Sequence, residues 1–264
     1  MSNAITAFLI DDLEDESCRF FVPAFLSVIY FSPLLMVKST FMAVKEMTNG
    51  YNAFSRFFEH SSKLMQEDVC RSGGAAGTDI LFGEYASRLG HKVIHYSFAG
   101  FEAQAKSRDS VILRKLTPYQ LQEADGYLLR ANATLKKEFP CGIEYRDNVL
   151  RRNWWIVRSV DTIYAVCRLD LKNQQPIGNV AFAIQCLIDR ASIERHRMRA
   201  YVFDQSRSKW YRFDFVRRVW IAIPAHRVPV PRGDYAGLGI AKLMPEGERA
   251  IAQLFRLSTW PVVN

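Results

Sequence analysis

The segment that most constrains the fold is a glycine-rich stretch between a short strand-like run and a helix-like run. Three glycines fall within five positions of Ser72-Gly73-Gly74-Ala75-Ala76-Gly77-Thr78-Asp79. Glycine reaches positive φ and lets the backbone approach a ligand closely. The residues from Asp68 to Arg71 predict a strand before the loop, and Ile80 to Leu89 predict a helix after it. The sequence therefore predicts a strand, a tight loop and a helix N-terminus.

This layout is typical of a site for an anion, with phosphate as the first candidate. The first N–H groups of a helix lack an intrahelical partner, and the helix dipole favours negative charge near them. We expect Thr78 to cap the helix and Asp79 to lie in its first turn. A side chain at Gly74 is expected to fill the place of the phosphate. The loop residues expected to bind the ligand are Ser72, Gly73, Gly74, Ala75, Gly77, Thr78 and Asp79.

The loop does not match the two best-known phosphate motifs. No Gly-Lys-Ser/Thr follows Gly77, so the loop is not of the Walker A type, and it lacks the G-x-G-x-x-G spacing of nicotinamide sites.

Strand-like and helix-like runs alternate along the chain after the loop. This alternation predicts an α/β fold, Rossmann-like, with a largely parallel sheet flanked by helices. We expect Tyr235–Gly239 to join that sheet although it lies far along the chain. The other expected strands are His91–Phe98, Thr162–Cys167, Arg199–Phe203 and its hairpin partner Lys209–Phe215. The expected helices are Tyr51–Gln66, Thr117–Lys137, Asn148–Arg158, Val180–Ala191 and Pro245–Leu257, and Gly100–Arg114 is expected to be a loop.

The N-terminal part is expected to be an apolar extension, residues 1–50, in front of one domain, residues 51–264. Phe20–Val37 carries no charge and has nearly the length of a membrane span. Pro23 and Pro33 interrupt it, and acidic residues precede it where a signal peptide would be basic. We therefore expect a cytoplasmic protein without a membrane segment.

The net charge and the spacing of cysteines and histidines indicate which classes of ligand the protein can bind. The formal net charge of +8 favours anionic partners such as nucleotides or nucleic acid. The chain has five cysteines and five histidines, without C-x-x-C or H-E-x-x-H spacing, so we expect no metal site. Cys167 and Cys186 are expected to be reduced, buried thiols. Arg151 and Arg152, expected at a helix start, fit two readings: a phosphate clamp or a solvent-exposed basic turn.

The stretch from Ser72 to Asp79 resembles the signature of the SLOG superfamily, which includes DprA-like DNA-processing proteins and LOG phosphoribohydrolases. It is similar to the Ser-Gly-x-Ala-x-Gly-Ile/Thr-Asp pattern of DprA-like members. Tyr235-Ala236-Gly237-Leu238-Gly239 resembles the Tyr-Ala-Gly-Ile-Gly strand of standalone members, and the resemblance covers about residues 50 to 257. It implies a Rossmann-like domain that binds nucleotides or nucleotide-derived ligands.

Two departures from that family argue against catalysis. Relatives often carry a second glycine loop, where this chain reads Ile177-Gly178-Asn179. LOG enzymes keep a catalytic glutamate where this chain has Leu81, which cannot do acid–base work. We expect no enzymatic activity; if the chain is an enzyme, nucleotide hydrolysis with Asp79 or Glu84 as the acid is the reaction that fits.

The sequence thus favours a binding module for a nucleotide or nucleotide-derived ligand, held at Ser72–Asp79 with help from Arg152. DprA-like binding of single-stranded nucleic acid is the first alternative and a nucleotide-processing hydrolase the second. The Trp154-Trp155 pair fits base stacking or core packing, and His95 fits packing at a strand end. No cofactor is expected beyond the nucleotide, and a homo-oligomer is left open.

Overall fold

A computed structural model describes residues 67–105, 109–194 and 197–257. Eight strands form one sheet in the order β3-β2-β1-β10-β4-β7-β8-β9. They are β1 (Val69–Ser72), β2 (Lys92–Phe98), β3 (Val111–Leu116), β4 (Thr162–Cys167), β7 (Arg199–Asp204), β8 (Lys209–Asp214), β9 (Val219–Ile223) and β10 (Asp234–Gly239). A separate pair joins β5 (Leu169–Asp170) to β6 (Gln175–Pro176).

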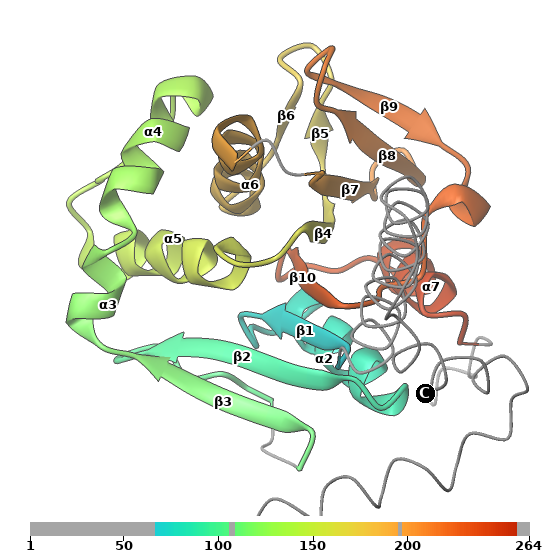
Figure 1. Ribbon diagram of the computed structural model, residues 1–264, viewed down its shortest axis with the longest axis horizontal. Coiled ribbons are helices and arrows are strands. Elements are labelled where there is room, and N and C mark those ends of the chain that lie inside the picture. Colours follow the sequence, from blue (N-terminus) through green and yellow to red (C-terminus); the bar gives the residue numbers. More distant parts are fainter. Residues whose placement is uncertain (1–66, 106–108, 195–196, 258–264) are drawn as a thin grey trace, which may run out of the picture. The chain divides into compact units, whose positions relative to one another are not determined.

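The helices connect these strands and cover the sheet. They are α2 (Thr78–Arg88), α3 (Pro118–Gln122), α4 (Asp125–Leu135), α5 (Glu144–Val157), α6 (Val180–Glu194) and α7 (Pro245–Leu254), with a short 3₁₀ turn at Ala225–Arg227. Helices α5 and α6 pack on one face of the sheet, and α2 and α7 on the other (Figure 1). This three-layer arrangement buries both faces of the central strands, so β4 has no exposed residue.

The sheet is mostly parallel, which confirms the predicted α/β class. From β3 to β7 every neighbouring pair is parallel, while β8 and β9 are antiparallel additions at one edge. The predicted strand at the end of the chain does join this sheet. Tyr235 of β10 pairs with Cys70 of β1 on one side and with Thr162 of β4 on the other. The hairpin expected after β7 is also present.

Three expectations differ from the structure. Part of the segment expected to be a loop, Gly100–Arg114, belongs to strand β3. The four middle residues of this edge strand are exposed, so its sequence does not show the alternation of buried and exposed residues that would indicate a strand. The long helix expected after Thr117 is divided into α3 and α4. Both helices keep apolar residues on the core, so the periodicity does not reveal the break. Strand β9 was not expected at all.

Some expectations fall outside the described residues: the boundary near residue 50, the helix Tyr51–Gln66 and the segment Phe20–Val37. Among the residues described, every helix is too short or too polar to cross a bilayer. Cys70, Cys167 and Cys186 are buried free thiols, as predicted for the last two. Burial raises the pKa of the Cys70 thiol to about 12.

Candidate functional site

The glycine loop lies at the carboxyl edge of the parallel strands, between the end of β1 and the start of α2. The end of β10 is its neighbour. Both the N–H and the hydroxyl of Thr78 donate to the carbonyl of Ile240, at 3.4 and 2.8 Å. The loop is thus attached to the residue that directly follows β10.

The helix cap differs from the expectation. Gly77, with φ of 84°, is the N-cap residue, and Thr78 is the first residue of α2. The hydroxyl of Thr78 donates a hydrogen bond to β10 instead of accepting one from the helix. The prediction that Thr78 caps the helix is therefore wrong, because the tertiary partner takes its hydroxyl. Asp79 does lie in the first turn, as predicted.

The three glycines serve close packing inside the protein. A Cβ on Gly73 would lie 2.6 Å from a carboxylate oxygen of Asp79, and one on Gly77 would lie 2.3 Å from the carbonyl oxygen of Ala241. A Cβ on Gly74 would lie 2.7 Å from Cβ of Ala103 and 3.2 Å from His95. A side chain at Gly74 would thus collide with protein, which corrects the expectation that it fills a phosphate's place.

Asp79 provides an internal anion for the loop. One oxygen of its carboxylate accepts the N–H of Gly239 at 3.1 Å, and the carboxylate also accepts the N–H groups of Gly73 and Ala75. Burial raises the pKa of Asp79 to about 6, against the opposing effects of Arg152 and of these backbone N–H groups. The inner part of the loop therefore already holds a carboxylate, at the place where a phosphate was expected.

Arg152 is brought to the loop from α5, although the two are 79 residues apart in sequence. Its side chain is 5% exposed, and its guanidinium donates to the carbonyl of Gly73 at 3.4 Å and lies 4.0 Å from the Asp79 carboxylate. It also stacks over the ring of Phe101 at 4.4 Å. Burial lowers the pKa of Arg152, and its Nε has no hydrogen-bond partner among the described residues. Arg152 is therefore a buried cation that contacts the loop from α5.

The two arginines of α5 do not act as a pair. Both arginines were expected at a helix start. The helix begins at Glu144, so Arg151 and Arg152 lie in its second half instead. Arg151 forms a two-pronged ion pair with Asp125, at 2.6 and 3.0 Å, and so ties α5 to α4. Only Arg152 reaches the glycine loop.

The accessible part of the loop is its tip. Ala76 is exposed, and Ala75 and Gly77 are half-buried. Among the described residues the N–H groups of Ala76 and Gly77 have no hydrogen-bond partner. They precede α2, whose dipole places partial positive charge there. The tip can therefore accept an anion from solvent even though the inner loop is filled.

His95 supports the loop and is not available as a base. It is 2% exposed, lies under Gly74 and Gly83, and leaves its Nδ1 without a hydrogen bond among the described residues. Burial, with a smaller effect of Arg152, lowers the pKa of His95 to about 4, so the ring is neutral at pH 7. A cavity of about 370 Å³ beside it is also lined by Glu84 of α2.

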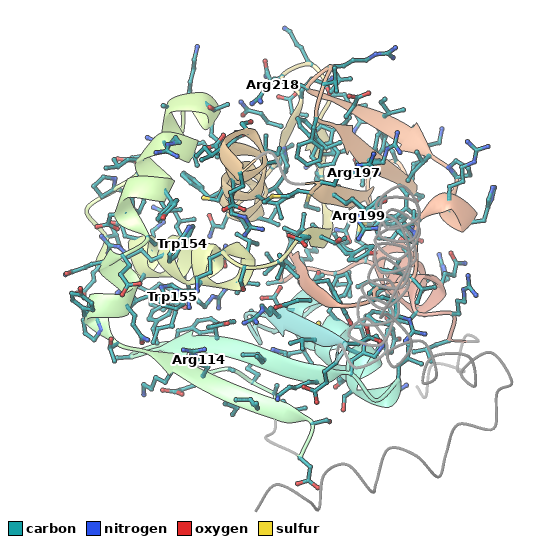
Figure 2. The ribbon with its side chains drawn as sticks, viewed as in Figure 1. Arg114, Trp154, Trp155, Arg197, Arg199 and Arg218 are labelled. Atoms are coloured by element: carbon teal, nitrogen blue, oxygen red, sulfur yellow. The ribbon has the colours of Figure 1, made fainter. Side chains whose placement is uncertain are left out.

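The tryptophan pair is part of the core. Trp154 and Trp155 are 8% and 2% exposed, and Trp155 donates its indole N–H to the carbonyl of Gln120. Figure 2 shows both on α5, above Arg114 of β3. The guanidinium of Arg114 lies 6.0 Å from the centre of the Trp155 ring. Of the two uses that the sequence allowed, the structure shows core packing.

The segment Ile177-Gly178-Asn179, compared with a second glycine loop in the sequence analysis, lies directly before α6. Gly178 has φ of 95°, and its carbonyl accepts the ammonium of Lys137 at 3.1 Å. No hydrogen bond between described residues joins Gly178 to the loop at Ser72–Asp79.

Sequence reasoning missed the partners that complete the site: Phe101, Asn153, Gly239 and Ile240. Asn153 is the neighbour of Arg152 and accepts its guanidinium at 3.1 Å. The similarity of Tyr235–Gly239 to a family strand was the one signal that could have placed Gly239 beside the loop.

Metal-binding residues do not gather in the described part of the chain: it has no group of three or more His, Cys, Asp or Glu arranged to hold a metal ion. No protein-family model, curated protein or solved structure matches this chain.

Proposed function

We propose that this protein binds a nucleotide or a nucleotide-derived ligand, with its phosphate at the tip of the glycine loop. The observation that carries the proposal is the position of the loop in the sheet. Strand order runs outward from β1 to β3 on one side and from β4 to β7 on the other. Ligands of open α/β sheets bind outside the carboxyl ends of the strands, where the order reverses. The loop after β1 lies at this place.

The contacts of the loop divide its residues between two roles. Gly73, Asp79 and Arg152 hold one another and shape the loop. The N–H groups of Ala76 and Gly77 offer donors to a phosphate at the start of an 11-residue helix. The carboxylate of Asp79 lies behind the tip, so a bound phosphate would contact the tip from the solvent side only. This geometry favours modest affinity and supports binding more than catalysis.

The decisive experiment is calorimetric titration of the full chain with nucleoside mono-, di- and cyclic phosphates. Ala76→Asp should abolish binding, because it places a negative charge at the proposed phosphate position without changing any packed residue. Ala76→Asn has nearly the same size and no charge, so it should retain most of the affinity. Absence of binding to every nucleotide at millimolar concentration, or equal affinity in Ala76→Asp, would refute the proposal.

The alternative of single-stranded nucleic acid rests on the net charge and on aromatic rings beside the loop. Phe101, which lies under Arg152, stacks on Phe98, and Phe98 lies 5.9 Å from Tyr145, which is 51% exposed. This alternative becomes the better reading if short oligonucleotides bind more tightly than any mononucleotide.

A further inference from the structure

A second cavity, of about 440 Å³, lies between α4, α5 and α6, away from the glycine loop. None of the residues that line it belongs to Ser72–Asp79. Its volume is in the range of pockets that hold small molecules, about 300–1,000 Å³. Helix α5 connects the two places: Arg152 faces the loop, while Trp154 lines the cavity.

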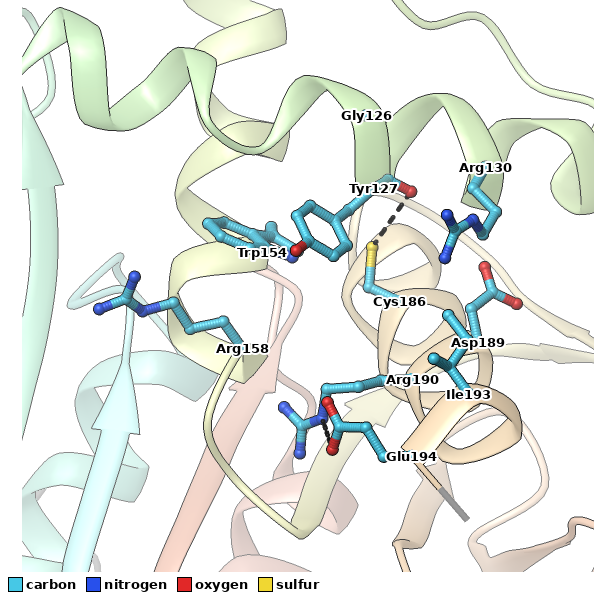
Figure 3. A pocket seen from close by; sticks show the side chains of 10 residues that line it. All are labelled: Gly126, Tyr127, Arg130, Trp154, Arg158, Cys186, Asp189, Arg190, Ile193 and Glu194. Atoms are coloured by element: carbon cyan, nitrogen blue, oxygen red, sulfur yellow. Dashed lines mark hydrogen bonds and ion pairs between the residues drawn. The ribbon is translucent and has the colours of Figure 1, made fainter. Parts of the chain in front are cut away.

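One wall of the cavity is aromatic. Tyr127 of α4 stacks on Trp154 of α5, with ring centres 4.6 Å apart and an angle of 26° (Figure 3). Tyr127 remains 47% exposed, so part of its ring is open to a ligand. Gly126, the preceding residue, also lines the cavity, and a Cβ there would meet nothing within 4 Å. The wall therefore offers a flat apolar surface with open space beside it.

The arginines at the cavity differ in whether their charge is already paired within the protein. Arg190 donates to the carbonyls of Val157 and Val160 and pairs with Glu194 at 3.4 Å, so its charge is already engaged. In contrast, Arg130 and Arg158 form no hydrogen bond or ion pair with any described residue. Arg158 stacks over Trp155 at 3.7 Å, which leaves the N–H edge of its guanidinium unpaired.

The remaining acid, Asp189, does not cancel these two cations. One of its oxygens accepts the amide of Gln185 at 2.7 Å, and the other is buried without a hydrogen bond among the described residues. Burial raises the pKa of Asp189, against the opposing effects of Gln185, Arg218 and Arg130. Figure 3 shows the guanidinium of Arg130 turned toward Asp189 without an ion pair between them. Three arginines and two acids line the cavity, so positive charge exceeds negative charge there.

We propose that this cavity is a binding site for a small planar aromatic molecule that carries one anionic group. The ring packs against Tyr127 at the aromatic wall, and the anionic group is held by Arg130; Arg158 lies over Trp155 and is turned away from this place (Figure 3). An aromatic carboxylate and a nucleoside monophosphate share this chemistry. The site is independent of the glycine loop and does not require the function proposed there.

The test is calorimetric titration of the full chain with indole-3-carboxylate and with AMP as probes. Indole tests the ring without charge, and tryptamine tests the same ring with a positive charge. We expect indole-3-carboxylate to bind more tightly than both. Binding of AMP that survives Ala76→Asp identifies a phosphate-bearing ligand at this cavity, and binding of indole-3-carboxylate alone identifies a carboxylate.

The variants use the open space at Gly126 and the unpaired guanidinium of Arg130. Gly126→Phe should block the cavity without a clash and abolish binding, whereas Gly126→Ala should retain it. Arg130→Gln should weaken binding about tenfold, the effect of losing one charge-assisted hydrogen bond. Arg158→Gln removes the same charge at a guanidinium turned away from the ligand, so it should leave the affinity nearly unchanged. The proposal is overturned if neither probe binds at millimolar concentration, if Arg130→Gln binds as tightly as wild type, if Gly126→Phe has no effect, or if tryptamine binds best.

Discussion

The carboxylate of Asp79 accepts the backbone N–H of Gly239 at 3.1 Å, and so joins the first turn of α2 to the end of β10 across 160 residues of sequence. The same carboxylate accepts two N–H groups of its own loop and faces the buried cation of Arg152. One side chain thus connects the glycine loop, the last strand and α5. Changes at Asp79 should therefore affect folding as well as ligand binding.

Asp79 should give the protein a pH-dependent stability of defined sign. Its pKa is raised from 3.8 to about 6 in the folded state, so folding favours the protonated form. The resulting stabilisation is complete below pH 3.8 and is lost as the pH rises through about 6. Urea unfolding of wild type and Asp79→Asn should show that wild type loses up to about 3 kcal/mol relative to the variant between pH 4 and pH 7.

Comparing wild type with Asp79→Asn also controls for the other buried titratable group near the loop, His95. His95, whose pKa is lowered to about 4, contributes with the opposite sign, because its stabilisation is lost as the pH falls. It is present in both proteins, so its contribution cancels to a first approximation. A difference that stays constant from pH 4 to pH 7 would contradict the raised pKa of Asp79.

Gly77 should be far less tolerant of a side chain than another glycine with positive φ. Gly77→Ala combines φ of 84° with a contact of 2.3 Å to a backbone carbonyl oxygen. We expect a loss of about 3 kcal/mol or more in the free energy of unfolding. Gly90 has φ of 78° and nothing within 4 Å of its Cβ position, so Gly90→Ala should cost only about 1 kcal/mol. Equal losses in thermal or urea unfolding would show that the packing at Gly77 is loose.

Salt dependence should separate the two kinds of anionic partner. A single phosphate at the loop tip replaces few counterions, so nucleotide affinity should change little between 50 and 200 mM salt. A protein with about 6–10 phosphate contacts loses about 10³–10⁵ in affinity over this range. Titration with AMP and with a short single-stranded oligonucleotide at both salt concentrations provides the measurement. A steep decrease for the oligonucleotide, with tighter binding at low salt than any nucleotide shows, would support nucleic acid as the partner.

Purified protein should release no appreciable adenine from AMP. The resemblance of the loop to the SLOG signature implies that Leu81 replaces the glutamate of LOG enzymes. The carboxylate of Asp79 is buried and engaged by backbone N–H groups. An acid or base must reach the scissile bond to act on it. Chromatography of the reaction mixture tests this. Steady adenine release that disappears in Asp79→Asn would establish a hydrolase instead.

Local sequence determined the α/β class, the glycine loop and most element positions, because these depend on apolar periodicity and on residues adjacent in the chain. It also placed Asp79 in a helical first turn. The prediction that Tyr235–Gly239 joins the sheet is confirmed, since β10 pairs with β1 and β4. Edge strand β3 was missed because an edge has exposed residues on both faces, as the four middle residues of β3 show.

Only the tertiary structure decided which chemical groups meet at the loop. Thr78 bonds to Ile240, Asp79 to Gly239, and Arg152 to Gly73, over separations of 162, 160 and 79 residues. Because of these contacts, the glycines that the sequence indicated as an open phosphate site are packed against protein atoms, and only the tip of the loop stays accessible. No local pattern encodes them, because each depends on where β10 and α5 settle against the loop once the core is buried.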